Sequence, residues 1–325
     1  MNKINLRLYK DSDFEMWNDF VSEAKNSTFL FRRDFMEYHK ERFHDYSLMI
    51  YVDNELIAIL PAHLKGDSLH SHQGLTYGGL LIKQKLRMTI FFEIFFEILK
   101  FLNNQEIAFF YWKEIPYFYN TFPNDEWKYL CFITKAELYR RDLCSVVDLR
   151  KDYYVSESVI RKAKMGKKSG IYYKKCNLWE EFWKEILEPE LLLNHKVLPV
   201  HSLEEILNLK SKFDDNIHLY CAFLGEKMLG GTVIFTDKKI AHSQYISVKT
   251  EYKNKKGLDF LHYQLLTEEF KNYDYFDFGI SNEENGKKIN KGLLFWKEGF
   301  GARGISQDFY KISTENYNLI EQMYL

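Results

Sequence analysis

One order of predicted secondary structure occurs twice along this chain, and it constrains the fold more than any other feature. In each half, apolar or alternating runs predict three successive strands, then an amphipathic helix, then a fourth strand. In the first half these segments are 48–52, 56–64, 74–82, 85–102 and 107–112. In the second half they are 218–223, 228–235, 240–248, 258–272 and 275–280. Strands that alternate with helices predict an α/β fold.

Two polar positions support a duplication of the whole unit. Glu55 and Gln73 are 18 residues apart, as are Glu226 and Gln244, and the two halves are offset by 171 residues. Solenoid repeats have periods of about 20–50 residues, so this spacing indicates a duplicated domain, with coincidence as the alternative. At about 150 residues per domain, 325 residues suit two domains. We expect an N-terminal domain at 1–145 and a C-terminal domain at 146–325.

Composition narrows the class of protein. Hydrophobic residues make up 46% of the chain and the formal net charge is -1, as in a globular protein with no dedicated nucleic-acid-binding charge. The four cysteines form no C-x-x-C pair, so no zinc site is predicted. Residues 1–6 lack the apolar core of a signal peptide, and the apolar run 89–102 is too short to span a bilayer. We therefore expect a cytoplasmic protein that does not insert into membranes.

The predicted order resembles the core of GNAT acyltransferases, in which an antiparallel meander is followed by a helix and a parallel strand. Two such units resemble the tandem-GNAT group that includes the FemAB-like transferases. Five segments carry a closer resemblance to bacterial sugar N-acyltransferases: LTYGGL at 75–80, PVHSLEE at 199–205, AHSQYI at 241–246, FDFGISNE at 276–283 and FWKEGFG at 295–301.

That resemblance implies a specific reaction. The enzyme would transfer an acyl group from acyl-coenzyme A, as co-substrate, to the amine of a nucleotide-linked amino sugar, such as a dTDP-amino-dideoxyhexose. The amine would attack directly in a ternary complex, and the product would enter a surface polysaccharide such as lipopolysaccharide. Two alternatives remain open. One is a Fem-type aminoacyl transferase that uses aminoacyl-tRNA, favoured by the basic helix expected after Ser156. The other is a non-catalytic scaffold of polysaccharide assembly.

A coenzyme A site is expected in the C-terminal unit. The GNAT phosphate loop usually reads Q/R-x-x-G-x-G/A, and only Gly257 of that pattern is present at 252–258. Backbone N–H groups at a helix start can still bind a pyrophosphate. The alternative is a solvated basic loop. The matching segment of the first half, 82–86, has no glycine. The predicted coenzyme A residues are Gln244, Ile246, Lys253, Asn254, Lys255, Lys256, Gly257 and Leu258.

The strand at 240–248 is expected to alternate, with His242 and Gln244 on one face and Tyr245 on the other. The GNAT resemblance implies that this strand diverges from its parallel neighbour and frees an N–H that polarises the thioester carbonyl. Tyr245 could protonate the departing thiolate, with core packing as the alternative. A general base is useful because the attacking amine must lose a proton. The candidates are His201, His242, Asp277 and Glu283, and we favour Glu283 on the loop after the last strand.

The acceptor site draws predictions from both halves. Two adjacent glycines in an apolar strand suggest the close approach of a ligand or of another backbone. The predicted acceptor-binding residues are His72, Gln73, Tyr77 and Gly78 in the first half, and Ser281, Asn282 and Lys297 in the second. His70 and His72 could bind a metal only with carboxylate partners that the sequence does not place, so no metal is expected.

Overall fold

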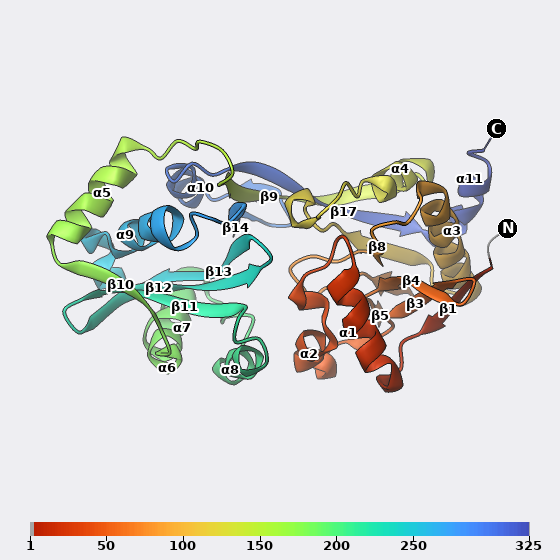
Figure 1. Ribbon diagram of the computed structural model, residues 1–325, viewed down its shortest axis with the longest axis horizontal. Coiled ribbons are helices and arrows are strands. Elements are labelled where there is room, and N and C mark those ends of the chain that lie inside the picture. The colour runs from red at the N-terminus through yellow and green to blue at the C-terminus, as the bar shows by residue number, and fades with distance from the viewer. Residues whose placement is uncertain (1–2, 325) are drawn as a thin grey trace. The chain divides into compact units, whose positions relative to one another are not determined.

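The computed structural model describes residues 3–324, which divide into two compact units (Figure 1). Unit 1 contains the described residues up to Asp142 and those from Ser306 onward, and unit 2 contains Leu143–Ile305. Met1 and Asn2, the start of the segment considered for a signal peptide, lie outside the described residues. The units differ from the expected 1–145 and 146–325 chiefly at the end. The last segment packs with unit 1 because strand β17 (Arg303–Ser313) pairs with β8 (Phe109–Lys113).

Unit 1 contains two sets of strands. The first has the order β1-β3-β4-β7, from Ile4–Leu8, Leu48–Val52, Glu55–Leu60 and Leu81–Ile82. The second has the order β17-β8-β6-β5-β2, where β6 is Ser68–His70, β5 is His63–Lys65 and β2 is His44–Asp45. The other helices include α1 (Phe14–Glu23), α2 (Arg33–Met36), α4 (Glu126–Ile133) and α11 (Asn318–Glu321).

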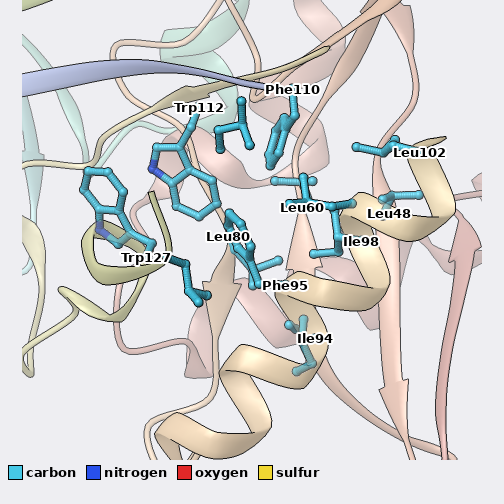
Figure 2. Close-up of a cluster of buried hydrophobic side chains, with 14 of the residues drawn as sticks. Leu48, Leu60, Leu80, Ile94, Phe95, Ile98, Leu102, Phe110, Trp112 and Trp127 are labelled. Carbon is cyan, nitrogen blue, oxygen red and sulfur yellow. The ribbon is translucent and has the colours of Figure 1, made fainter. Parts of the chain in front are cut away.

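The core of unit 1 forms around helix α3 (Met88–Asn104). Its apolar side buries Ile94, Phe95 and Ile98 against strand residues such as Leu60 and Phe110, as Figure 2 shows. These side chains recur every three or four residues, which places them on one face of the helix. The predicted helix is therefore confirmed, and its burial stabilises the unit.

Two strand predictions in unit 1 are wrong. The segment predicted as one strand at 56–64 is divided between β4 and β5, which belong to different sheets. Of the segment predicted at 74–82, only Leu81–Ile82 is a strand. The chain leaves β6 at His72, which has a positive φ of 59°, and turns again at Gly79, where φ is 95°. A Cβ atom on Gly78 would lie 1.9 Å from the carbonyl oxygen of Ser71, so only glycine fits there. The two glycines serve this tight crossing of backbones and not a regular strand.

Unit 2 contains one mixed sheet with the order β10-β11-β12-β13-β14-β9. These strands are Ile171–Cys176, Ile217–Leu224, Lys227–Asp237, Ile240–Val248, Tyr275–Ile280 and Glu137–Asp148, the last of which begins in unit 1. Neighbouring strands are antiparallel except β13 and β14, which are parallel.

Helices cover both faces of this sheet. In Figure 1, α5 (Glu157–Lys168) and α9 (Gly257–Gln264) lie on one side of the strands, and α6 (Trp179–Phe182), α7 (Glu188–His195) and α8 (Leu203–Lys212) lie on the other. A capping box starts α8, since the side chains of Ser202 and Glu205 accept hydrogen bonds from each other's backbone N–H groups. The helix predicted at 258–272 consists of α9 followed by a π-helical turn at Leu265–Glu269, so it ends before the predicted residue 272.

Both units repeat one element order: a strand, helices, three or more strands, a helix, and a strand parallel to an earlier one. The parallel pairs are β6 with β8 in unit 1 and β13 with β14 in unit 2. Among the described residues, no helix is both long and apolar enough to cross a lipid bilayer.

Candidate functional site

Strands β13 and β14 form a fork in unit 2. They pair at three positions, the last of which joins His242 to Asp277, and then the two strands separate. Strand β13 continues to Val248 and β14 continues to Ile280. Beyond the last pair, the β13 backbone facing β14 is free of this ladder and can bond a ligand.

A histidine and an aspartate meet at the base of the fork. The Nδ1 atom of His242 lies 2.8 Å from Oδ2 of Asp277, and the side chains are 14% and 3% exposed. The other carboxylate oxygen, Oδ1, accepts a hydrogen bond of 2.7 Å from the backbone N–H of Gly279. Because a carboxylate only accepts, we assign the ring proton to Nδ1, which leaves Nε2 of His242 as a hydrogen-bond acceptor.

Lys297 on α10 (Lys291–Glu298) holds the end of strand β14. Its Nζ donates to the carbonyl oxygens of Gly279 at 3.0 Å and Ile280 at 2.6 Å. The side chain is buried, and this burial lowers the pKa of Lys297 to about 8, against an opposing effect from Asp277. Lys297 therefore fixes the strand that carries Asp277.

The side chains of β13 do not alternate strictly. The register with β12 shifts between Val233 and Ile234, which pair with Tyr245 and Ser243, so Gln244 is an extra residue. Ala241 and Ile246 consequently pack with the same core, although strict alternation would place them on opposite faces. His242 and Tyr245 thus point to the same side of the sheet, away from α9.

Tyr245 and His201 contact each other. The Tyr245 hydroxyl accepts from the backbone N–H of His201 at 3.1 Å and lies 2.6 Å from its Nδ1. The tyrosine ring packs edge-on against Trp183, and burial raises its pKa to about 12. The predicted catalytic residues therefore include two contacting pairs, His242 with Asp277 and His201 with Tyr245.

Glu283, the base favoured from the sequence, lies in a small hairpin formed by β15 (Asn282–Glu283) and β16 (Lys288–Ile289), where its side chain is exposed. Its neighbours Ser281 and Asn282 are buried, and Oδ1 of Asn282 accepts from the backbone N–H of Leu143 at 2.7 Å. The buried position of Asn282 supports the hairpin itself.

A pocket of about 750 Å³ lies beyond the fork. Its floor includes Ile246 and Val248 of β13, and one end is the start of α9. Five of the predicted coenzyme A residues line it: Ile246, Lys253, Lys256, Gly257 and Leu258. Gln244, Asn254 and Lys255 are not among its lining residues. A Cβ atom on Gly257 would lie 3.1 Å from Leu229, so this glycine lets the helix start close to the sheet.

The walls of this pocket were not predicted. Helix α7 contributes Glu190 and Leu191, and α10 contributes Leu293 and Trp296. The Glu190 carboxylate accepts from the backbone N–H of Thr250 at 2.6 Å and from its hydroxyl at 2.8 Å. No spacing in the sequence marks this contact, because it joins two segments 60 residues apart.

The pocket has features that fit coenzyme A. The free edge of β13 can bond the amides of an extended pantetheine arm, and the start of α9 presents backbone N–H groups to a phosphate. Lys253 and Lys256 add positive charge, while Glu190 opposes it from the α7 side. Ile246 lies four residues beyond His242, about 13 Å along an extended strand.

The acceptor-binding residues predicted in unit 1 are not among the lining residues of this pocket. Tyr77 is buried, and its hydroxyl donates to Oγ1 of Thr28 at 2.8 Å. Gly78 packs on Ser71, at the crossing of backbones beside β6. His72 is buried among other rings, which lowers its pKa well below the usual value, and Gln73 is exposed. The described residues contain no group of three or more His, Cys, Asp or Glu side chains placed to hold a metal ion.

Neither a protein-family model nor a curated protein matches the sequence. The chain is similar in structure to FemX, with a TM-score of 0.67 and 10% identity over 98% of this chain and 100% of that one. It is also similar to L-PGS from Bacillus licheniformis, with a TM-score of 0.57 and 12% identity over 97% and 94% of the two chains. A tandem GNAT protein from the clavulanic acid biosynthesis pathway gives a TM-score of 0.54 and 10% identity over 96% and 99%.

These matches cover nearly the whole chain at very low identity, so they establish the fold. The protein has a tandem GNAT, FemAB-like fold in which each unit is a GNAT-like α/β domain. The predicted fold class is confirmed.

Proposed function

We propose that this protein is an N-acyltransferase that moves an acyl group from acyl-coenzyme A to the amine of a nucleotide-linked amino sugar. One observation carries the proposal. The His242–Asp277 pair stands at the base of a strand fork that leads along β13 to a pocket ending at a helix start. A thioester at the fork and a pyrophosphate at the helix would then be joined by the pantetheine arm.

In this mechanism, the pocket positions the donor. The pyrophosphate binds the first N–H groups of α9 with Lys253 and Lys256, and the pantetheine amides bond the free edge of β13. A backbone N–H of that edge donates to the thioester carbonyl, whose oxygen becomes negative as the tetrahedral intermediate forms. Losing one such donor typically costs about 10²–10³-fold in rate, so positioning contributes substantially.

His242 is assigned the proton transfers. Its Nε2 takes a proton from the attacking nitrogen as the C–N bond forms, and the imidazolium is stabilised by Asp277. When the intermediate collapses, the C–S bond breaks and His242 returns that proton to the thiolate, giving the amide and free coenzyme A. We assign this role to His242 rather than Glu283 because His242 is held at the fork by a buried carboxylate, whereas Glu283 is exposed on its hairpin.

A second candidate has a specific observation in its favour. Helix α5 presents the exposed side chains of Arg161, Lys164, Lys167 and Lys168, which form a basic surface. Such a surface suits a polyanion, and thus a Fem-type aminoacyl transferase that uses aminoacyl-tRNA. Binding of tRNA to this surface would weaken steeply as salt rises.

The deciding experiment is a panel of acyl-coenzyme A donors against nucleotide-linked amino sugars, read by release of free thiol. We expect turnover with at least one pair, and its loss in His242→Gln with coenzyme A binding retained by calorimetry. Turnover with aminoacyl-tRNA and none with acyl-coenzyme A would establish the second candidate. Absence of coenzyme A binding together with absence of any turnover would leave a non-catalytic scaffold.

A further inference from the structure

Unit 1 contains a second fork of the same design. Strands β6 and β8 are parallel and pair at three positions, the last of which joins His70 to Tyr111. The backbone N–H of Ser71 still bonds the carbonyl of Tyr111 at 2.9 Å, and the chain then turns away at His72. In the duplicated topology, His70 and Tyr111 stand where His242 and Asp277 stand in unit 2.

The residue change at this position removes the proton-transfer chemistry. Tyr111 offers no carboxylate to orient a histidine, and instead its ring stacks on His70 with centroids 4.5 Å apart and planes 9° apart. A neutral stack of this kind cannot stabilise an imidazolium as Asp277 can. The unit 1 fork is therefore suited to binding and not to general-base catalysis.

A pocket of about 170 Å³ opens at this fork, entirely within unit 1. Its lining includes His70, Gln73, Tyr111, Lys113, Tyr139 and Arg140. We call it the unit 1 pocket. It is large enough for one phosphate or carboxylate group with part of a sugar ring, and too small for a whole nucleotide.

The charges around the unit 1 pocket do not balance. No carboxylate is among the described lining residues of the pocket, and Arg140 donates hydrogen bonds of 2.9 and 2.6 Å to the neighbouring Asp142. Lys113 donates to the backbone carbonyl of Leu75, and among the described contacts it has no carboxylate within ion-pair distance. Burial, reinforced by Arg140 and partly opposed by Asp142, lowers the pKa of Lys113 to about 7. An anion would relieve the unfavourable burial of this cation.

We propose that the unit 1 pocket binds an anionic group, a phosphate or a carboxylate carried on a sugar, between Lys113 and the His70–Tyr111 stack. The ammonium of Lys113 supplies the charge, and the flat rings supply a surface for the apolar face of the sugar. The binding itself is independent of the proposed acyl transfer. Only the identification of this anion with the acceptor of the reaction rests on the proposed function.

The test is calorimetric binding to the full chain without any acyl donor. Glucose 1-phosphate and glucuronic acid represent the two sources of the anion, and glucose is the neutral probe. We expect one or both anions to bind at least about tenfold more tightly than glucose, because a hydrogen bond to a charged group is worth about 1.5–3 kcal/mol. The tighter anion identifies the source.

Two variants and one control sharpen the result. Lys113→Met should weaken anion binding relative to glucose about 10- to 100-fold. Gln73→Glu adds a carboxylate to an exposed side chain that lines the pocket and should also weaken anion binding. Because Oε1 of Gln73 lies 3.3 Å from Nε2 of buried His63, urea unfolding of this variant checks that the fold is retained. Lys85→Met removes an exposed lysine of the same unit and should leave the affinity unchanged. Anions that bind no better than glucose, or equally well in both pocket variants, would overturn the proposal. Coenzyme A binding, measured in parallel, would report on the proposed function separately.

Discussion

Replacing Asp277 with asparagine tests the geometry of the fork directly. The aspartate uses its two oxygens on two different donors, Nδ1–H of His242 at 2.8 Å and the backbone N–H of Gly279 at 2.7 Å. Asparagine has nearly the same shape but only one oxygen, and its other terminal group is an NH₂ donor. It can therefore satisfy only one of these two contacts in the present arrangement.

Each orientation of the asparagine predicts a measurable defect. If its oxygen faces Gly279, its NH₂ faces Nδ1 of His242, and the ring proton moves to Nε2. Nε2 can then no longer accept the proton of the attacking amine. The turnover number should then fall about 10²–10⁴-fold. If its oxygen faces His242, its NH₂ opposes the N–H of Gly279 in a buried site. The free energy of unfolding should then fall by about 1–3 kcal/mol.

The assay combines thiol-release kinetics against pH with urea unfolding of Asp277→Asn. His242→Gln and the double variant complete a cycle, and the double variant should lose little more rate than the worse single one, because the two residues act as a unit. Glu283→Gln is the matched carboxylate control and should retain more than a tenth of the turnover. An Asp277→Asn protein that keeps both its turnover within threefold and its unfolding free energy within about 0.5 kcal/mol would refute the argument.

Three single contacts give further predictions. Between pH 8 and 10.5 the unfolded state binds a proton at Lys297 that the folded state has lost. The free energy of unfolding should therefore rise with pH, by at most about 1.4 kcal/mol per pH unit. Lys297→Met should flatten this slope, as measured by urea unfolding at several pH values. Gly230→Ala should destabilise unit 2 by about 1–3 kcal/mol, because its Cβ would lie 2.6 Å from the carbonyl oxygen of Ser247, and an unchanged thermal midpoint would contradict this. Tyr245→Phe removes the hydroxyl that contacts both the backbone N–H and Nδ1 of His201, and it should lower the free energy of unfolding by about 1–3 kcal/mol. A loss of turnover with full stability would instead support a role of Tyr245 in protonating the thiolate.

Local sequence patterns sufficed for most of the fold. The strands of unit 2 are apolar runs bounded by short turns, and the turn at Asp53 and Asn54 has the two positive φ values that a tight hairpin requires. The return of the described residues from Ser306 onward to unit 1 could not be predicted in this way. It depends on the pairing of β17 with β8, whose residues are nearly 200 positions apart in the chain.

For the candidate site, the sequence indicates residue types but not their geometry. The sequence offers both His242 and Asp277 as candidate bases, but their contact depends on the parallel register of β13 and β14, which no local spacing indicates. The extra residue Gln244 also changes which side chains share a face. The position of Glu283 after β14 favours it as a base, but the sequence does not indicate that the hairpin exposes its carboxylate.

The two forks lead into different segments of chain, and this difference explains why the donor site is assigned to unit 2. After His242, strand β13 continues to Val248 and the chain enters α9 at Gly257, so a free strand edge and a helix start face one pocket. After His70, the chain turns at once and forms β7 before α3 begins at Met88. The unit 1 fork thus lacks the extended edge that a pantetheine arm needs. It retains only the small space beside its last paired residues, where Lys113 makes an anion the best-matched ligand.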